Sequence, residues 1–128
     1  MKKLFFVFLL IFCGKISAVV DICLLNEKHY CLTSMVKIVA NPQLYYGKKI
    51  AIHGVFEQDL GHYLIFIDTE KSKIKSTVDA VELGIDKGLA NELMKHKGDY
   101  ISFRGTFNEN LGSNTAGILE DITIWDTM

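Results

Sequence analysis

The chain has 128 residues, of which 49% are hydrophobic and 23% charged, and its formal net charge is −1. This length allows one domain, and no internal repeat, low-complexity tract or linker divides it. Because nucleic-acid binding depends on an excess of basic residues, the composition argues against that class of function.

The first eighteen residues have the pattern of a secretory signal peptide. Two lysines give a basic start, residues 4–13 form an apolar run, and residues 16–18 offer a cleavage site of small residues. The run is too short for a membrane span, which needs roughly twenty apolar residues, and no later segment approaches that length. We therefore expect an exported protein, periplasmic or secreted, with a signal peptide at 1–18 and one domain at 19–128. Without the three lysines of the leader, the domain carries 11 basic against 15 acidic residues, a net charge of −4.

Cysteine usage agrees with an oxidising compartment. Cys13 lies in the leader, which leaves Cys23 and Cys31 as an even pair, and we expect a disulfide between them. It would close a loop of about nine residues and contribute roughly 2–3 kcal/mol. The spacing disfavours a catalytic dithiol, whose cysteines usually lie two residues apart at a helix start. A lipid anchor on Cys13 is a further alternative, against which Phe12 argues because the residue before a lipidated cysteine is small.

The first predicted element of the domain is a short helix. Thr33 or Ser34 can cap it, and apolar residues that follow lie on one face. It ends at Asn41-Pro42, because the residue before a proline is pushed out of helical geometry. This helix should pack on whatever core the strands build.

Three strands are predicted after this helix as a meander. Gly47 turns the chain into the first strand, in which Gly54 is expected to form a bulge that lets the strand bend. The charged stretch at 68–76 is predicted to be a solvated loop, although its alternate lysines would share one side of an extended segment. The predicted strands span residues 48–56, 62–68 and 77–83.

A second helix and two more strands complete the pattern. Asp86 is the expected N-cap of the helix and Gly98 its end, and the strands span residues 100–107 and 116–125. The order is strand, strand, strand, helix, strand, strand. That order predicts a mainly β fold, a five-stranded Greek-key OB-fold barrel with a short N-terminal helix and a helix between strands 3 and 4. An open α+β sheet is the alternative.

Several short segments of the chain match a known sequence pattern. The matching positions are Asn41, Pro42, Tyr45, Gly47, Lys48, Gly54, residues 105–107 and residues 116–118. At these positions the chain resembles a family of exported bacterial OB-fold proteins that is largely uncharacterised. In that family an NPxxYxGKxVxxxG segment opens the barrel, a GTF-like triplet closes strand four and an AGxIxxI-like segment forms strand five. The resemblance covers roughly residues 34–125 and implies the fold, and it brings no catalytic residues.

The motif residues have architectural roles that need no family. Pro42 fixes the exit from the first helix, and Tyr45 can bury its ring with the hydroxyl at the rim. Gly47 permits the positive φ with which the backbone enters the first strand. The alternative interpretation places these residues at the rim of a binding site. His53 is expected to point outward from the first strand and is a candidate ligand contact.

The patterns that mark catalytic or metal sites are missing from the sequence. The four histidines have no metal-ligand spacing, and the cysteines do not cluster. No nucleophile elbow occurs, and the glycine-bearing segment at 111–117 lies between strands rather than before the helix that a phosphate loop needs. We therefore expect a protein without metal or cofactor that is not an enzyme.

A candidate binding face follows from strand alternation. If Leu64 and Phe66 point into the barrel, their neighbours point out, together with residues of strands one and three. The face of strands one to three is the usual ligand platform of OB folds, and an apolar one suggests a protein partner or self-association. The alternative is that the first helix or the tethered N-terminus covers it. The candidate contacts on this face are His53, Tyr63, Ile65, Ile67 and Ala80.

Three functions remain as hypotheses. The first is an exported, non-enzymatic module that binds a protein through this face, in an immunity or inhibitor role toward an exported effector. The second is an oligomeric OB subunit that binds a small molecule or a glycan. The third, single-stranded nucleic-acid binding, needs stacking aromatics beside cations, for which Tyr63 is the best candidate on the face.

Overall fold

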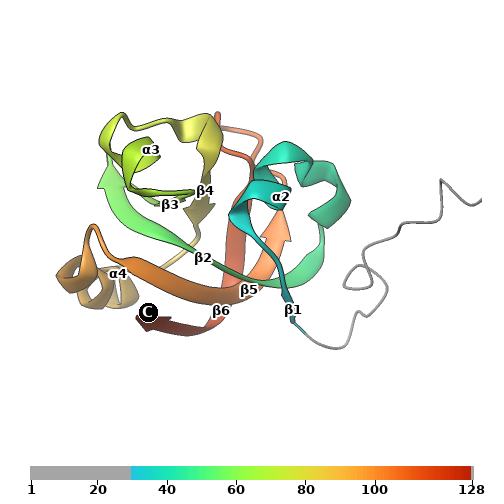
Figure 1. Ribbon diagram of the computed structural model, residues 1–128. Coiled ribbons are helices and arrows are strands. Elements are labelled where there is room, and N and C mark those ends of the chain that lie inside the picture. Colours follow the sequence, from blue (N-terminus) through green and yellow to red (C-terminus); the bar gives the residue numbers. More distant parts are fainter. Residues whose placement is uncertain (1–29, 128) are drawn as a thin grey trace, which may run out of the picture.

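Six strands carry the fold in the computed structural model, which describes residues 30–127 (Figure 1). Five of them alternate between side chains that enter one core and side chains on the outside, as strands with one buried face do. The strands are β1 (Cys31–Leu32), β2 (Lys48–Asp59), β3 (His62–Phe66), β4 (Ala80–Leu83), β5 (Tyr100–Asn108) and β6 (Ile118–Thr127).

The strands β2 to β6 close into a barrel. Their order is β2-β3-β4-β6-β5, and β5 returns to pair with β2, antiparallel from Lys48↔Phe107 to Val55↔Tyr100. The contact between β4 and β6 is parallel, and the other neighbours in the barrel are antiparallel. This strand order, with a helix between the third and fourth barrel strands, is that of the OB fold. The predicted fold is confirmed.

The strand β1 was not predicted. It pairs parallel with the first half of β2, Cys31 opposite Ile50, whereas β3 pairs with the second half. Cys31 is disulfide-bonded. Its predicted partner, Cys23, and the predicted signal peptide at 1–18 lie outside the described residues, so both remain predictions.

Short helices connect the strands. Both predicted helices form, and their caps are as expected: Ser34 accepts a hydrogen bond from the backbone N–H of Lys37 at 3.2 Å, and Asp86 accepts one from Leu89 at 2.8 Å. The α-helices are α2 (Met35–Ala40), α3 (Thr69–Lys73) and α4 (Lys87–Leu93), and the 3₁₀ helices are η2 (Pro42–Tyr45), η3 (Thr77–Asp79) and η4 (Met94–His96). None of the described helices is long and apolar enough to cross a membrane.

The charged stretch at 68–76 is not simply a loop. It contains α3, which begins after Asp68 because the carboxylate of this residue accepts a hydrogen bond from the N–H of Lys71 at 2.8 Å. The strand expected at 62–68 therefore ends at Phe66. The strand expected at 77–83 begins at Ala80, since the three residues before it form η3.

Glycines have different roles just before β2 and within it. Gly47 has the expected positive φ of 79°, and its N–H donates to the carbonyl oxygen of Phe107 at 2.6 Å. Gly54 forms no bulge, because the pairing of β2 is regular on both sides of it. A Cβ at Gly54 would overlap the carbonyl oxygen of Phe66, so glycine is required there for the close approach of β2 and β3. The irregularity lies instead in the pairing of β5 with β6, where Arg104 pairs with Ile124 and Thr106 with Glu120, so the extra residues are in β6.

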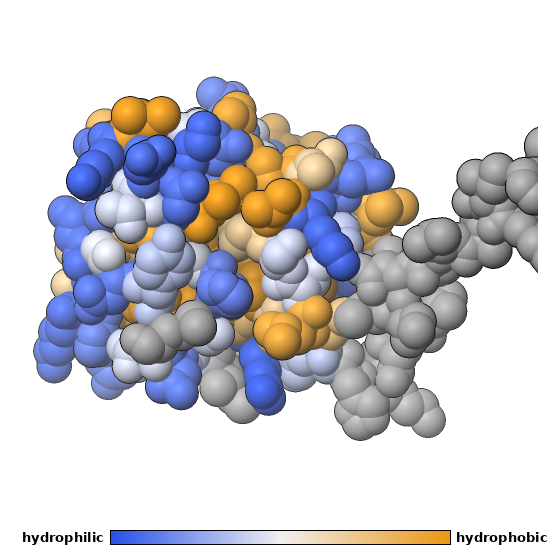
Figure 2. All heavy atoms as spheres, in the orientation of Figure 1, coloured by the Kyte–Doolittle hydropathy of each residue, from blue (hydrophilic) through white to orange (hydrophobic). Residues whose placement is uncertain are grey.

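Aromatic and aliphatic side chains fill the barrel. Phe56, Phe103 and Phe107 are fully buried, and the motif residue Tyr45 is 4% exposed. Outside the barrel, the surface drawn in Figure 2 is mostly hydrophilic over α4, and hydrophobic atoms gather beside α2. The domain therefore has one hydrophobic core inside the barrel and a smaller hydrophobic cluster on the outside of β3.

One buried polar group in the described residues lacks a partner. Thr33 is 7% exposed, and its side-chain hydroxyl makes no hydrogen bond. An unsatisfied buried hydroxyl costs about 1–3 kcal/mol, and valine has nearly the same shape. We expect Thr33→Val to raise the free energy of unfolding by about 1 kcal/mol in urea titrations followed by the fluorescence of Trp125.

The control for this prediction is Thr123→Val. The Thr123 hydroxyl donates a hydrogen bond to the hydroxyl of Tyr30 at 3.1 Å, so the same substitution there removes an interaction instead of an unsatisfied group. Destabilisation by Thr33→Val equal to that of the control would contradict the prediction.

Candidate binding site

The orientation expected for β3 is wrong. Ile65 is fully buried inside the barrel, and Tyr63 and Ile67 are partly buried against the same core. The ring of Tyr63 stacks on that of Phe56, with centroids 6.3 Å apart and planes 7° from parallel. These three side chains therefore do not form an apolar outer face. Tyr63 and Ile65 face the barrel core, and Leu64 and Phe66 point outward.

The outward side chains of β3 are those at the even positions. Leu64 and Phe66 form a second cluster with Val55 and with Ala80, which is also fully buried. The helix α3 contacts both β2 and β3 and lies next to β3, above it in the view of Figure 1. Part of the expected platform is thus covered, and by α3 rather than by the N-terminal helix.

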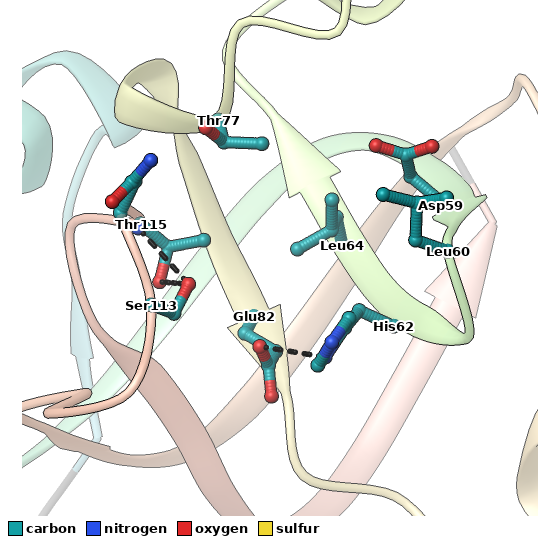
Figure 3. A pocket seen from close by; sticks show the side chains of 9 residues that line it. Asp59, Leu60, His62, Leu64, Thr77, Glu82, Ser113 and Thr115 are labelled. Carbon is teal, nitrogen blue, oxygen red and sulfur yellow. Dashed lines mark hydrogen bonds and ion pairs between the residues drawn. The ribbon is translucent and has the colours of Figure 1, made fainter.

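A pocket of about 160 Å³ lies where the outer face of β3 and β4 remains open (Figure 3). Its walls come from the β2–β3 turn, from β3 and β4, from η3 and from the β5–β6 loop. In OB folds the ligand face lies on the second and third barrel strands between these two connections. The pocket is lined by Asp59, Leu60, His62, Leu64, Thr77, Glu82, Ser113, Asn114 and Thr115.

A contact between His62 and Glu82 forms one side of the pocket. Nδ1 of His62 lies 3.2 Å from Oε1 of Glu82, and the two side chains point toward each other in Figure 3. The Glu82 side chain is 18% exposed and that of His62 61%. The side-chain amide of Asn110 also donates to Oε1 of Glu82, at 3.4 Å. Glu82 is therefore a carboxylate held in place from two sides at the pocket wall.

The side of the pocket at the β2–β3 turn carries the second carboxylate. Figure 3 places Asp59 and Leu60 across the pocket from Ser113 and Thr115. Oδ1 of Asp59 lies 3.3 Å from Nζ of Lys75, which does not line the pocket. The lining residues thus include two carboxylates and neither lysine nor arginine, so the pocket favours ligands that donate hydrogen bonds.

Hydrogen bonds fix the β5–β6 loop against β4. The N–H of Glu82 donates to the carbonyl of Gly117 at 3.0 Å. Within the loop, the hydroxyl of Thr115 donates to the same carbonyl at 3.1 Å and accepts from the side-chain amide of Asn110 at 3.0 Å. Ser113 bonds to Thr115 through its hydroxyl at 3.2 Å. This wall of the pocket is preorganised, which lowers the entropy lost when a ligand binds.

The hydroxyl and imidazole groups of the pocket bond to different partners. Ser113 bonds to Thr115 while His62 bonds to Glu82, so no hydrogen bond links the histidine to the serine. The described residues contain no group of three or more histidine, cysteine or acidic side chains placed to hold a metal ion.

Among the residues proposed from the sequence, only His53 is exposed on an outward strand face; it pairs with Ser102 and lies outside this pocket. The pocket residues are not recognisable from the sequence, because they come from five separate segments. The one sequence signal near them is the turn-forming composition of the β2–β3 and β5–β6 connections.

No protein-family model matches the chain, and no curated protein sequence matches it significantly. The resemblance to exported OB-fold proteins therefore depends on the motif residues alone.

Proposed function

We propose that this protein is an exported, non-enzymatic OB-fold module that binds a protein partner at the pocket between β3, β4 and the β5–β6 loop. The observation that carries the proposal is a preorganised pocket at the OB ligand position, surrounded by exposed aliphatic side chains. Export through residues 1–18, the family resemblance and an immunity or inhibitor role toward an exported effector belong to the same proposal.

The size of the pocket favours an anchor side chain over a whole ligand. Small-molecule sites usually measure roughly 300–1,000 Å³, and this pocket measures about 160 Å³. Such a volume holds one side chain of a partner, in the manner of a binding hot spot. The two carboxylates and the hydroxyl groups of the lining favour a side chain with hydrogen-bond donors.

Exposed hydrophobic residues around the pocket supply a rim for the partner. Leu60, which lines the pocket, is 92% exposed, and Leu111 in the β5–β6 loop is 89% exposed. Val78, next to the lining residue Thr77, is 61% exposed. Apolar side chains on three neighbouring connections are typical of a protein interaction surface.

The test measures affinity for a partner with pocket variants. Proteins captured from the envelope and the medium are purified, and their dissociation constants are measured by calorimetry with the wild type, Leu60→Asn and Glu82→Gln. Asparagine tolerates the positive φ of 50° at Leu60, so the fold is retained. We expect each variant to bind at least about ten-fold more weakly, because Glu82→Gln loses the charged acceptor of the pocket and Leu60→Asn loses an apolar contact at its rim.

The matched control is Glu92→Gln, which neutralises an exposed carboxylate on α4, outside the pocket. It should bind as the wild type does. A partner that binds the wild type and both pocket variants equally would contradict the proposed site.

A small polar molecule or a single sugar is the second candidate. The hydroxyl and amide groups of Thr77, Ser113 and Asn114 favour it, since such groups bond to sugar hydroxyls. Glycan binding by the wild type that Glu82→Gln abolishes, without any protein partner, would favour this alternative. Nucleic acid receives no support at this site, because its lining offers neither stacking aromatic rings nor lysine or arginine.

A further inference from the structure

A second cavity, of about 220 Å³, lies on the outside of the barrel beside β1. It shares no lining residue with the pocket described above. Its walls come from β1, β2, β5 and the end of β6. The lining residues are Leu32, Ala51, Ser102, Phe103, Arg104 and Asp126.

Strand register explains why these side chains meet. Residues at alternate positions of β2 and β5, such as Ile52 and Phe103, enter the core, so their neighbours face outward. In one row across the sheet, Leu32 pairs with Ala51 and Ala51 with Arg104.

The next row holds His53, Ser102 and Asp126, each opposite the one before. Serine stands between histidine and aspartate in this row, and no hydrogen bond joins the three among the described residues, so the row is not a catalytic triad. It is a set of polar groups left available on an open sheet face.

Arg104 is the lining residue of this cavity that can bind an anion. It is the only arginine in the chain, its side chain is exposed, and it makes no ion pair or hydrogen bond with any described residue. A guanidinium group matches a carboxylate with two parallel hydrogen bonds, a geometry that lysine cannot offer. The hydroxyl of Ser102, next to it along β5 on the same face, can add a third donor.

The remaining lining residues restrict which anion fits. Leu32 is 72% exposed, and with Ala51 it gives an apolar wall for an aliphatic group. Asp126 places a negative charge in the same cavity, which repels a second anionic group on the ligand. We propose that this cavity binds a single carboxylate that carries a short aliphatic group.

Two sources offer this chemistry, a free aliphatic monocarboxylate and the C-terminal residue of a peptide with an aliphatic side chain. The cavity volume suits either, since each places one carboxylate and a few carbon atoms in it. The carboxylate site shares no residue with the pocket at β3 and β4. A negative result for carboxylate binding would therefore leave the proposed function standing.

The experiment is an NMR titration of the ¹⁵N-labelled protein with hexanoate and with a short peptide ending in leucine, as the free acid and as the amide. We expect hexanoate or the peptide acid to shift the amide signals of Ala51, Ser102 and Arg104, and the peptide amide to shift none. Arg104→Gln should weaken binding at least about ten-fold. Lys49→Gln, which removes an exposed cation of β2 outside the cavity, should leave it unchanged.

Selectivity supplies the second readout. Succinate and phosphate should bind the wild type more weakly than hexanoate does. In Asp126→Asn the difference in affinity between hexanoate and these two ligands should be smaller. Shifts from the peptide acid alone would assign the site to a peptide C-terminus, and shifts from hexanoate would assign it to free acids. Absence of shifts with all the probes, equal affinity in Arg104→Gln, or equal binding of peptide acid and amide would overturn the proposal.

Discussion

Ile65→Glu is expected to unfold the protein at room temperature. The Ile65 side chain lies fully buried in the barrel core. Its replacement forfeits about 2–3 kcal/mol of apolar burial, and a carboxyl group with no partner there costs several kcal/mol more. Domains of this size have roughly 5–15 kcal/mol of stability in total. Circular dichroism and Trp125 fluorescence should show loss of the native spectra.

Leu60→Glu is the control for this prediction, because Leu60 is 92% exposed at the neighbouring turn. It introduces the same charge and should change the free energy of unfolding little. A folded Ile65→Glu variant with native-like stability would show that the side chain does not face the core, and would restore the outward orientation first inferred for this strand.

Gly54→Ala is expected to lower the free energy of unfolding by roughly 3 kcal/mol. The new methyl group would overlap the carbonyl oxygen of Phe66, a backbone atom that cannot move without separating β2 from β3. The expected result is a large shift of the urea midpoint with an unchanged slope, since the surface exposed on unfolding is nearly the same.

Gly88→Ala tests the same change where there is room. Gly88 is exposed in α4, and a Cβ there would meet only the Asp86 carboxylate, at 3.4 Å. Alanine has a higher helix propensity than glycine, so the free energy of unfolding of this variant should rise by about 0.5–1 kcal/mol. If Gly54→Ala were as stable as Gly88→Ala, the close approach of β2 and β3 would not be what requires glycine.

Much of the fold was predictable because its signals are local. The caps at Ser34 and Asp86 and the helix end at Gly98 depend on side chains within a few residues, and the order of elements then selects the barrel. The helix α3 was missed because its five residues, TEKSK, have no apolar stripe, and helices are recognised in sequences by such a stripe.

The alternation of β3 could not be decided from its sequence. Leu64 and Phe66 occupy one parity and Tyr63 and Ile65 the other, so both faces are apolar and a shift of one residue exchanges them. Both faces are in fact buried, one by the barrel core and one by the cluster outside it. Strand periodicity identifies a buried face only when the other face is polar.

The candidate sites were hidden for a different reason. The pocket is assembled by residues from separate turns and strands, and the Arg104 cavity by the register of β1, β2, β5 and β6. No spacing along the chain encodes these encounters. His53 was the one outward residue identified correctly from the sequence, and its neighbours Ser102 and Asp126 became apparent only with the register.

The pairing of β2 with β5 also sets the order in which the chain can fold. The β2–β3–β4 meander and the β5–β6 hairpin join neighbouring segments, but the barrel closes only when Lys48 meets Phe107 across most of the domain. The entropy of closing that long loop is lost before the ladder stabilises it. Closure is therefore the slow event, and until it occurs both halves present unpaired strand edges to neighbouring chains. A protein of this topology is most exposed to aggregation in the interval before β2 and β5 meet.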